Sequence, residues 1–274
     1  MRKVKKLSSS GIQKYKQCPR KFEIHYLIEE LEFPDEGEVE HLQIGNTIHD
    51  SLEDSLDELE NVPDKENELL EILEEKENYQ DYNYSDNDKV DTCLKTASRW
   101  ISSFVTDIKH VEEEWSMEKD DITYNGLADL VADIDLGDED DSEIYENVII
   151  DWKTGKENEE WKERIQAGMY IEMFYQKFGH YPDAAVFVYL DEETQSFHSR
   201  IQNGEVFWNE HENKYWTEIE KIKNEILHTE QTGDWETKPE TANCYWCDYK
   251  LYCEDSPVGA ENVEKRHINI GEMI

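Results

Sequence analysis

Basic residues are scarce in this chain, where 28 Lys and Arg stand against 67 Asp and Glu and leave a formal net charge of −39. Such a charge imbalance would ordinarily indicate disorder. Eight Trp, 15 Tyr and several amphipathic segments supply the apolar surface that a disordered chain lacks, so we expect a folded protein. Self-repulsion of this size is easiest to tolerate where salt shortens the Debye length, to about 3 Å at 1 M. The composition therefore favours a halophilic cytoplasm.

Long apolar runs are also missing from the chain. No segment is apolar enough to cross a membrane, and no apolar run follows the basic residues near the start. We therefore expect a cytoplasmic protein with no membrane partner. A chain of 274 residues can form one large domain with appendages, and we interpret residues 1–274 as a single domain.

The few basic residues are unevenly distributed, because more than a quarter of them precede Glu23, the first acid of the chain. This segment is either a solubilising terminus or a phosphate-binding arm, and composition does not separate the two. The residues concerned are Arg2, Lys3, Lys5, Lys6, Lys14, Lys16, Arg20 and Lys21.

Cysteines are few, but three of the five lie within ten residues, at Cys244, Cys247 and Cys253. Without a secretory signal, this spacing indicates metal binding rather than disulfides. Cys18 is the natural fourth ligand, because Cys93 flanks the apolar stripe of an expected helix and is best interpreted as a small buried residue. Such a site would join the two ends of the chain. The spacing fits an iron–sulfur cluster at least as well as zinc and does not decide between them.

Apolar periodicity predicts helices over 10–17, 41–60, 90–108, 159–178 and 207–228, the first capped by Ser10. Alternation predicts strands over 113–118, 122–134, 147–153, 184–190 and 195–201. This order predicts an α/β or α+β fold with a mixed central sheet flanked by helices. Residues 61–87 are interpreted as an acidic peripheral insertion with a short helix at 68–75, residues 244–253 as a Cys-rich module and residues 254–274 as a tail.

Two carboxylates in expected strands stand out. Asp151 and Lys153 lie two residues apart at the end of an apolar strand and so share one face; on its own the pair could be a chance ion pair. Asp129 is embedded among apolar neighbours, where a carboxylate is costly unless a cation or hydrogen bonds satisfy it, which suggests a metal ligand. His49 on one helix and the pair Gln166 and Tyr170 on another are weak signals by themselves.

In combination, these residues resemble the RecB-like branch of the PD-(D/E)xK nucleases, specifically its iron–sulfur members, the CRISPR-associated exonucleases and AddB-type nuclease domains. The resemblance covers most of the chain and rests on six elements in family order. They are Leu7-Ser8-Ser9-Ser10 leading to Cys18-Pro19-Arg20-Lys21-Phe22, Gly45-x3-His49, Gly126-Leu127-Ala128-Asp129, Ile150-Asp151-Trp152-Lys153-Thr154-Gly155, Gln166-x3-Tyr170 and the three C-terminal cysteines.

The resemblance implies a restriction-endonuclease-like core and a set of roles. His49, Asp129, Asp151 and the backbone carbonyl of Trp152 would hold Mg²⁺ or Mn²⁺. Lys153 would orient the attacking water and stabilise charge on the scissile phosphate, while Gln166 and Tyr170 would line the substrate side. The four-iron four-sulfur cluster, with zinc as the alternative, would be bound by Cys18, Cys244, Cys247 and Cys253.

The function implied is a metal-dependent exonuclease acting on single-stranded DNA or DNA ends, in CRISPR adaptation or in recombination and repair, with proteins of those pathways as partners. A non-catalytic metal-stabilised nucleic-acid-binding module is the alternative. Because a polyanion must avoid repelling DNA, we expect a single-strand path past residues 2–21, with aromatic stacking that tolerates salt.

Overall fold

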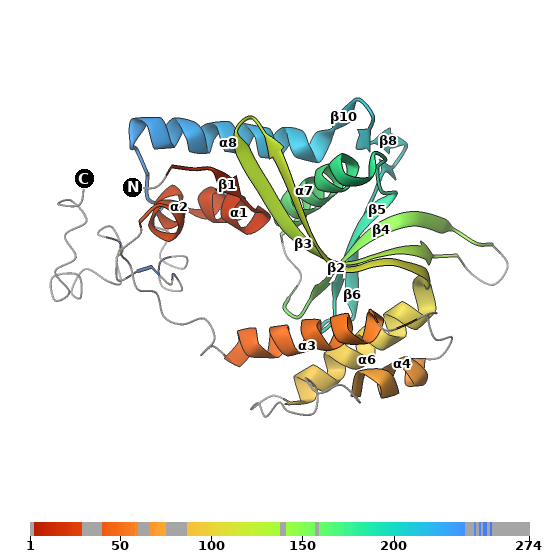
Figure 1. The fold of residues 1–274 in the computed structure, drawn as a ribbon. Helices are drawn as coiled ribbons and strands as arrows, with labels where there is room; N and C mark the ends of the chain where they lie inside the picture. Colours follow the sequence, from red (N-terminus) through yellow and green to blue (C-terminus); the bar gives the residue numbers. More distant parts are fainter. Residues whose placement is uncertain are drawn as a thin grey trace. The chain divides into compact units, whose positions relative to one another are not determined.

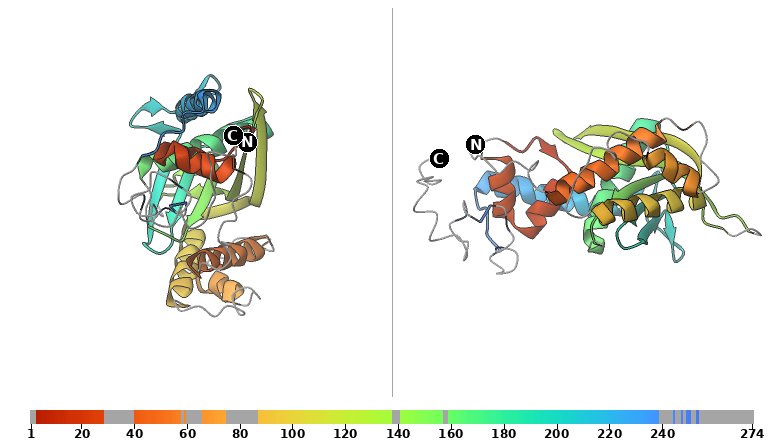
Figure 2. Two further views of the ribbon diagram at one scale, coloured as in Figure 1. Left: turned by 90° about the vertical axis from the view of Figure 1, so that its left-hand side faces the viewer. Right: turned by 90° about the horizontal axis from the view of Figure 1, so that it is seen from below.

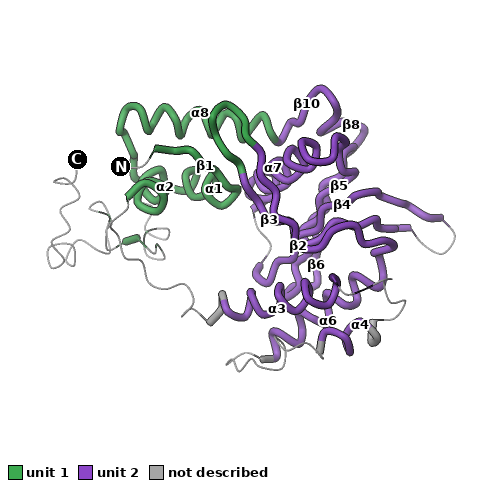
Figure 3. Tube along the Cα trace, in the orientation of Figure 1, with its two compact units in different colours: residues 1–32, 118–124, 216–274 green, residues 33–117, 125–215 purple. Residues whose placement is uncertain are grey.

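The computed structural model describes residues 3–28, 40–57, 59, 66–74, 87–137, 141–156 and 159–238, together with 244, 247, 249, 250 and 253. The expected tail at 254–274, Arg2 of the basic segment, and most of the acidic stretch 61–87 lie outside the described residues. The described chain divides into two compact units (Figure 3). Unit 1 comprises Met1–Glu32, Glu118–Tyr124 and Trp216–Ile274, and unit 2 comprises Phe33–Met117 and Asn125–Tyr215.

The sheet of unit 2 is mixed (Figure 1). It contains β2 (Val105–Lys119), β3 (Ile122–Asp135), β4 (Ile144–Lys153), β5 (Ala184–Tyr189) and β6 (Thr194–Ser199). The strands follow the order β3-β4-β5-β6, and β2 pairs with β3. Strands β4 and β5 run parallel, because helix α7 (Glu160–Phe178) connects them as a crossover. The pairs β3–β4 and β5–β6 are antiparallel.

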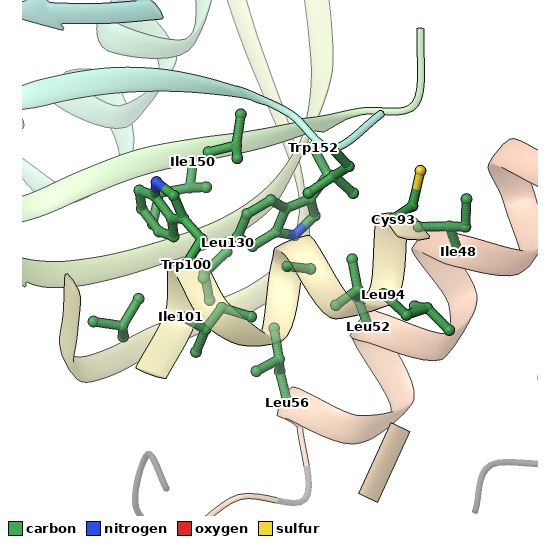
Figure 4. Close-up of a cluster of buried hydrophobic side chains, with 14 of the residues drawn as sticks. Ile48, Leu52, Leu56, Cys93, Leu94, Trp100, Ile101, Leu130, Ile150 and Trp152 are labelled. Carbon is green, nitrogen blue, oxygen red and sulfur yellow. The ribbon is translucent and has the colours of Figure 1, made fainter. Parts of the chain in front are cut away.

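Three of the described helices cover one face of this sheet: α3 (Glu40–Leu56), α4 (Glu66–Glu74) and α6 (Asn87–Phe104), which lie together in the views of Figure 2. Their apolar stripes pack against the residues of β3, β4 and β5 that alternate towards them. Figure 4 shows this core around Trp152, whose ring lies 5.6 Å from that of Trp100. Its labelled members include Ile48, Leu52, Leu56, Cys93, Leu94, Ile101, Leu130 and Ile150.

The opposite face of the sheet carries α7. Strand alternation turns Asp151 and Lys153 of β4, and Phe187 and Tyr189 of β5, away from the Trp152 core. On this face the two charged side chains of β4 lie beside buried apolar residues such as Ile149 and Phe187. The α/β fold with a mixed sheet flanked by helices is confirmed.

Unit 1 brings together the first described helices of the chain and its last described helix. Strand β1 (Lys6–Leu7) pairs in parallel with the start of β3, and α1 (Ser9–Gln17) and α2 (Pro19–Tyr26) follow it. The long helix α8 (Lys214–Thr232) contacts α1, where the Tyr15 hydroxyl hydrogen-bonds to that of Thr229 at 2.8 Å. Farther on, the backbone N–H of Arg20 donates to the carbonyl of Glu236.

The short strands β7 (Ile201–Gln202), β8 (Glu205–Val206), β9 (Trp208–Asn209) and β10 (Glu212–Asn213) precede α8. The helix expected from residue 207 therefore begins seven residues later. The apolar residues Phe207 and Trp208 were mistaken for the start of the helical stripe. Trp208 instead lies in β9, where it is buried and its indole N–H donates to the carbonyl of Pro182.

Two other boundaries differ from expectation. Helix α1 is capped by Ser8 rather than Ser10, because Ser8 has the extended backbone of a cap and its hydroxyl accepts from the N–H of Gly11. Helix α6 ends at Phe104, and 105–108 already belong to β2. Positions four apart, such as Phe104 and Ile108, satisfy both the helical and the strand period, so the stripe alone could not mark the change.

The acidic stretch 61–87 contains the expected short helix, α4. Its Leu69 and Leu73 are fully buried in the core with α3 and α6, so this helix is an integral part of the helical layer of unit 2.

Candidate active site

Asp151 and Lys153 end β4 as a direct ion pair. The Lys153 ammonium lies 2.5 Å from Oδ2 of Asp151, whose side chain is only 5% exposed. This oxygen otherwise accepts no hydrogen bond, and its approach to the ammonium lacks hydrogen-bond geometry. It is unusual for a buried carboxylate oxygen to be satisfied by charge alone, without a hydrogen bond. Oδ2 of Asp151 is therefore the atom best suited to bind a metal cation.

Helix α7 holds the other oxygen of Asp151. The Gln166 side-chain amide donates to Oδ1 at 2.7 Å, and the Tyr170 hydroxyl lies 3.0 Å from the same atom. Gln166 also accepts from the Lys153 ammonium through Oε1 at 3.1 Å. Because residues four apart share one face of a helix, a single stretch of α7 restrains both members of the ion pair.

Asp129 on β3 and His49 on α3 complete the group. Oδ2 of Asp129 accepts from the backbone N–H of Trp152 at 2.6 Å, and Oδ1 lies 3.4 Å from Nδ1 of His49. The expected embedded acid is thus satisfied by one N–H and one imidazole. The Trp152 side chain packs in the hydrophobic core.

Two glycines permit close approaches in this group. A Cβ on Gly126 would lie 2.9 Å from both the Tyr170 ring and the end of Met173, so only glycine leaves room for the tyrosine. A Cβ on Gly45 would lie 3.3 Å from the hydroxyl of Thr154, just beyond β4. Gly45 therefore lets α3, which carries His49 one turn later, approach the end of that strand.

The electrostatics of the group reflect burial among like charges. Burial raises the pKa of the Asp151 carboxyl, Lys153 opposes this, and Asp129 reinforces it. Burial alone would lower the pKa of His49, but Asp129 and then Asp151 outweigh it and raise that pKa. Burial and the two carboxylates raise the pKa of the Tyr170 hydroxyl well above its usual value, so the hydroxyl keeps its proton and remains a hydrogen-bond donor.

The donor set suits a hard divalent cation, since it combines two carboxylates and an imidazole with the weakly satisfied Oδ2 of Asp151. Within the described ranges, however, no three His, Cys, Asp or Glu side chains converge as a metal site. The contacts explain this: Lys153 lies against Asp151, while His49 and the Trp152 N–H occupy the oxygens of Asp129.

The cysteines predicted to bind a cluster lie in unit 1. All five cysteines of the chain are described, and none forms a disulfide. Burial raises the pKa of the Cys244 thiol, and Cys247 and Cys18 raise it further. The backbone N–H of Cys247 donates to the carbonyl of Cys244 at 3.3 Å, so these two residues share a turn. The absence of any three-residue metal site within the described part of the chain applies to them as well, so no cluster is shown. Cys93 is fully buried in the core of unit 2, as expected.

At the end of β4, Asp151, Lys153 and Asp129 thus lie together with His49 of α3 and with Gln166 and Tyr170 of α7. The family model of the PD-(D/E)XK nuclease superfamily matches residues 6–254. The chain therefore belongs to the PD-(D/E)XK nuclease superfamily, whose members are nucleases that typically use Mg²⁺ or Mn²⁺, and DNA is the substrate that such a domain implies. No curated protein matches the chain. Among the described helices, none is long and apolar enough to span a membrane.

Sequence reasoning missed one polar cluster beside this site. Glu163 of α7 is buried with Tyr189, Ser196 and His198 of β5 and β6. A signal was present: Glu163 lies three residues before Gln166 and seven before Tyr170, and so on the same face of the helix. An acid at such a position must be paired, but the sequence does not show which residues pair with it.

Proposed function

We propose that this protein is a metal-dependent DNA exonuclease in which Asp129, Asp151, His49 and the Trp152 carbonyl bind Mg²⁺ or Mn²⁺. The proposal rests mainly on one observation: Asp151 and Lys153 are both restrained by Gln166, with Tyr170 on the same carboxylate oxygen. A merely solvated strand end would not be restrained in this way.

The bound ion, Lys153 and the two residues of α7 would each have a separate role in catalysis. When bound, the divalent ion would lower the pKa of a coordinated water and polarise a phosphoryl oxygen. Lys153 is held between Gln166 and the ring of Phe187, 5.5 Å away, so its ammonium is positioned to orient the water and to stabilise charge developing on the phosphate. Tyr170 and Gln166 keep Asp151 from rotating.

The test compares single-stranded and blunt double-stranded DNA with Mn²⁺ or Mg²⁺ in concentrated KCl. We expect shortening from the ends, and loss of about 10²–10³-fold in rate for Lys153→Gln, which removes the charge but keeps a polar side chain that is one atom shorter. Lys177→Gln is the matched control, since Lys177 lies on α7 but pairs with Glu113 outside the site. Nicking of circular DNA at comparable rates would contradict an exonuclease.

The observed ion pair favours one competing function, a binding module in which Asp151 and Lys153 are purely structural. Removing one member of a buried pair leaves an uncompensated charge and destabilises the fold. Under this alternative, Lys153→Gln lowers stability, and the wild-type protein neither cleaves DNA nor binds Mn²⁺. Under the nuclease proposal, the wild-type protein binds Mn²⁺ in calorimetry.

We also propose that Cys18, Cys244, Cys247 and Cys253 bind a four-iron four-sulfur cluster, with zinc as the alternative. Thiolate sulfurs are the donors that both prefer. The turn that joins Cys244 and Cys247, and the rise that Cys18 and Cys247 cause in the pKa of Cys244, support a shared site. Iron and sulfide analysis and the visible spectrum of anaerobically purified protein test it. A colourless preparation with stoichiometric zinc would reject the cluster.

The RecB-like subtype, and with it a role in CRISPR adaptation or in recombination and repair, is proposed from the order of the six sequence elements.

The DNA path past the basic segment is supported in unit 1 by Lys14, whose ammonium lies 5.4 Å from the Tyr26 ring and 5.9 Å from the Tyr249 ring. Leu7 and Ile12 are buried, so deleting the segment would disrupt the fold. Replacing the exposed Lys3, Lys5 and Lys6 by Gln is the better test, and we expect weaker DNA binding with a shallower salt dependence.

A further inference from the structure

Three polar side chains on one face of helix α7, at positions 163, 166 and 170, form hydrogen bonds to the sheet of unit 2. Tyr170 donates from its hydroxyl to the carbonyl of Leu127 at 2.6 Å and reaches Asp151. Gln166 bonds to Asp151 and Lys153. Glu163 occupies the third position, where the proposed chemistry gives it no role.

Glu163 is buried and fully satisfied. Its Oε1 accepts from the Tyr189 hydroxyl at 2.5 Å, and its Oε2 accepts from Ser196 at 2.6 Å and lies 3.1 Å from Nε2 of His198. A carboxylate can only accept, so Nε2 of His198 carries a proton. The other ring nitrogen lies 3.1 Å from the Tyr215 hydroxyl. Burial would raise the pKa of Glu163, but the bonds from His198, Ser196 and Tyr189 outweigh it, so Glu163 stays ionised.

Two of the three partners of Glu163, Ser196 and Tyr189, lie in the same rows of the sheet as Asp151 and Lys153. Asp151 is paired in register with Phe187, and Phe187 with Ser196. Lys153 is paired in register with Tyr189. Because paired residues lie side by side across a sheet, the strand positions that bind Glu163 are fixed relative to those of Asp151 and Lys153.

The spacing on the helix places Gln166 between two anchors. Seven residues make almost two full turns, so Glu163 and Tyr170 lie nearly in line, about 10.5 Å apart along the axis. Tyr170 fixes one end of this stretch, and Glu163 fixes the other. Apolar side chains of the stretch, such as Ile165 and Met169, are buried too, but they form no directional bonds. Without Glu163, Tyr170 would be the one directional anchor beside Gln166, and the Gln166 amide could shift away from Asp151.

We infer that Glu163, bound by Tyr189, Ser196 and His198, is a positioning residue of the active site that keeps the Gln166 side chain aimed at Asp151 and Lys153. It would act only through Gln166. The inference rests on the proposed function, because a positioning role needs a metal-dependent site to position.

A double-mutant cycle on Mn²⁺ affinity and on cleavage rate tests this. The variants are Glu163→Gln, Gln166→Ala and the pair together. Outer partners of metal ligands typically change metal affinity or activity by 10–100-fold, so we expect Glu163→Gln to weaken Mn²⁺ binding about tenfold and to lower kcat more than it raises KM. In the Gln166→Ala background, the same change should have almost no further effect, because the residue through which it acts is gone.

Two further variants separate positioning from general stability. Leu73→Ala removes a fully buried side chain in the core with α3 and α6, and should lower stability without changing Mn²⁺ affinity. Tyr189→Phe removes only the hydroxyl that binds Glu163, and stands in for Glu163→Gln if that variant does not fold. At His198, the conservative variant His198→Gln keeps an N–H donor and should retain more Mn²⁺ affinity than His198→Leu.

Additive losses in the cycle, or Mn²⁺ binding by Glu163→Gln equal to that of Leu73→Ala, would overturn the inference and leave the nuclease proposal intact. A wild-type protein that neither binds Mn²⁺ nor cleaves DNA would overturn both. A tenfold loss that disappears in the Gln166→Ala background supports the inference.

Discussion

Replacing Gly126 by alanine should damage the active site through a single methyl group. The new Cβ would lie 2.9 Å from Cε1 of Tyr170 and 2.9 Å from the end of Met173. The Met173 terminus is flexible and can move at little cost. The Tyr170 ring cannot move freely, because its hydroxyl bonds to the Leu127 carbonyl, to Gln166 and to Asp151.

The expected effect of Gly126→Ala has two parts, a loss of stability and a loss of Mn²⁺ affinity or cleavage rate. Overpacking a closed site costs about 1–3 kcal/mol in stability. If the ring shifts away, Asp151 loses a hydrogen bond to a charged group, worth about 1.5–3 kcal/mol, which corresponds to roughly a tenfold to hundredfold loss of Mn²⁺ affinity or cleavage rate. Gly126→Ala should therefore lose both stability and function, whereas Tyr170→Phe should lose mainly function.

The assays are urea denaturation in concentrated KCl followed by Trp fluorescence, and Mn²⁺ titration by calorimetry. Gly155→Ala is the matched control for stability, since a Cβ there would meet nothing within 4 Å. It should change the free energy of unfolding by no more than about 0.5 kcal/mol. If Gly126→Ala were as stable as Gly155→Ala and bound Mn²⁺ like the wild-type protein, the argument from the close approach of Tyr170 would be refuted.

Three other predictions concern pH and salt. The pKa of Glu163 is lowered, so its stabilising effect is present above the ordinary carboxyl pKa near 4.5 and is lost as the pH falls below that value. Thermal unfolding should therefore show that the difference in stability between the wild-type protein and Glu163→Gln disappears in acid. A hydrogen bond shared with Glu112, then burial and nearby acids, raises the pKa of Glu53 to about 7, so this group destabilises the fold as the pH rises from about 4.5 through 7. Glu53→Gln should be more stable than wild type at pH 8 and equal to it at pH 4, and equal stability at pH 8 would contradict the raised pKa. With a net charge of −39, the thermal midpoint should rise steadily with KCl, and a midpoint independent of salt would reject the halophilic interpretation.

Local pattern determined much of this protein. The period of two in a strand placed Asp151 and Lys153 on the face opposite Trp152, and the period of 3.6 placed Gln166 beside Tyr170. The stripes of α3 and α6 also form the core as expected. These features depend on residues close in sequence, whose relative directions the backbone geometry fixes.

Tertiary structure alone decided the pairings between distant segments. Asp129 meets His49 across 80 positions of the chain, and Glu163 meets His198 across 35. Nothing in the local sequence distinguishes His198 from the other histidines. The register between β5 and β6 brings it to Glu163, and that register depends on which apolar residues the sheet buries on its other face. The sequence could thus show that a buried acid needs a partner, but only the packed sheet could supply its identity.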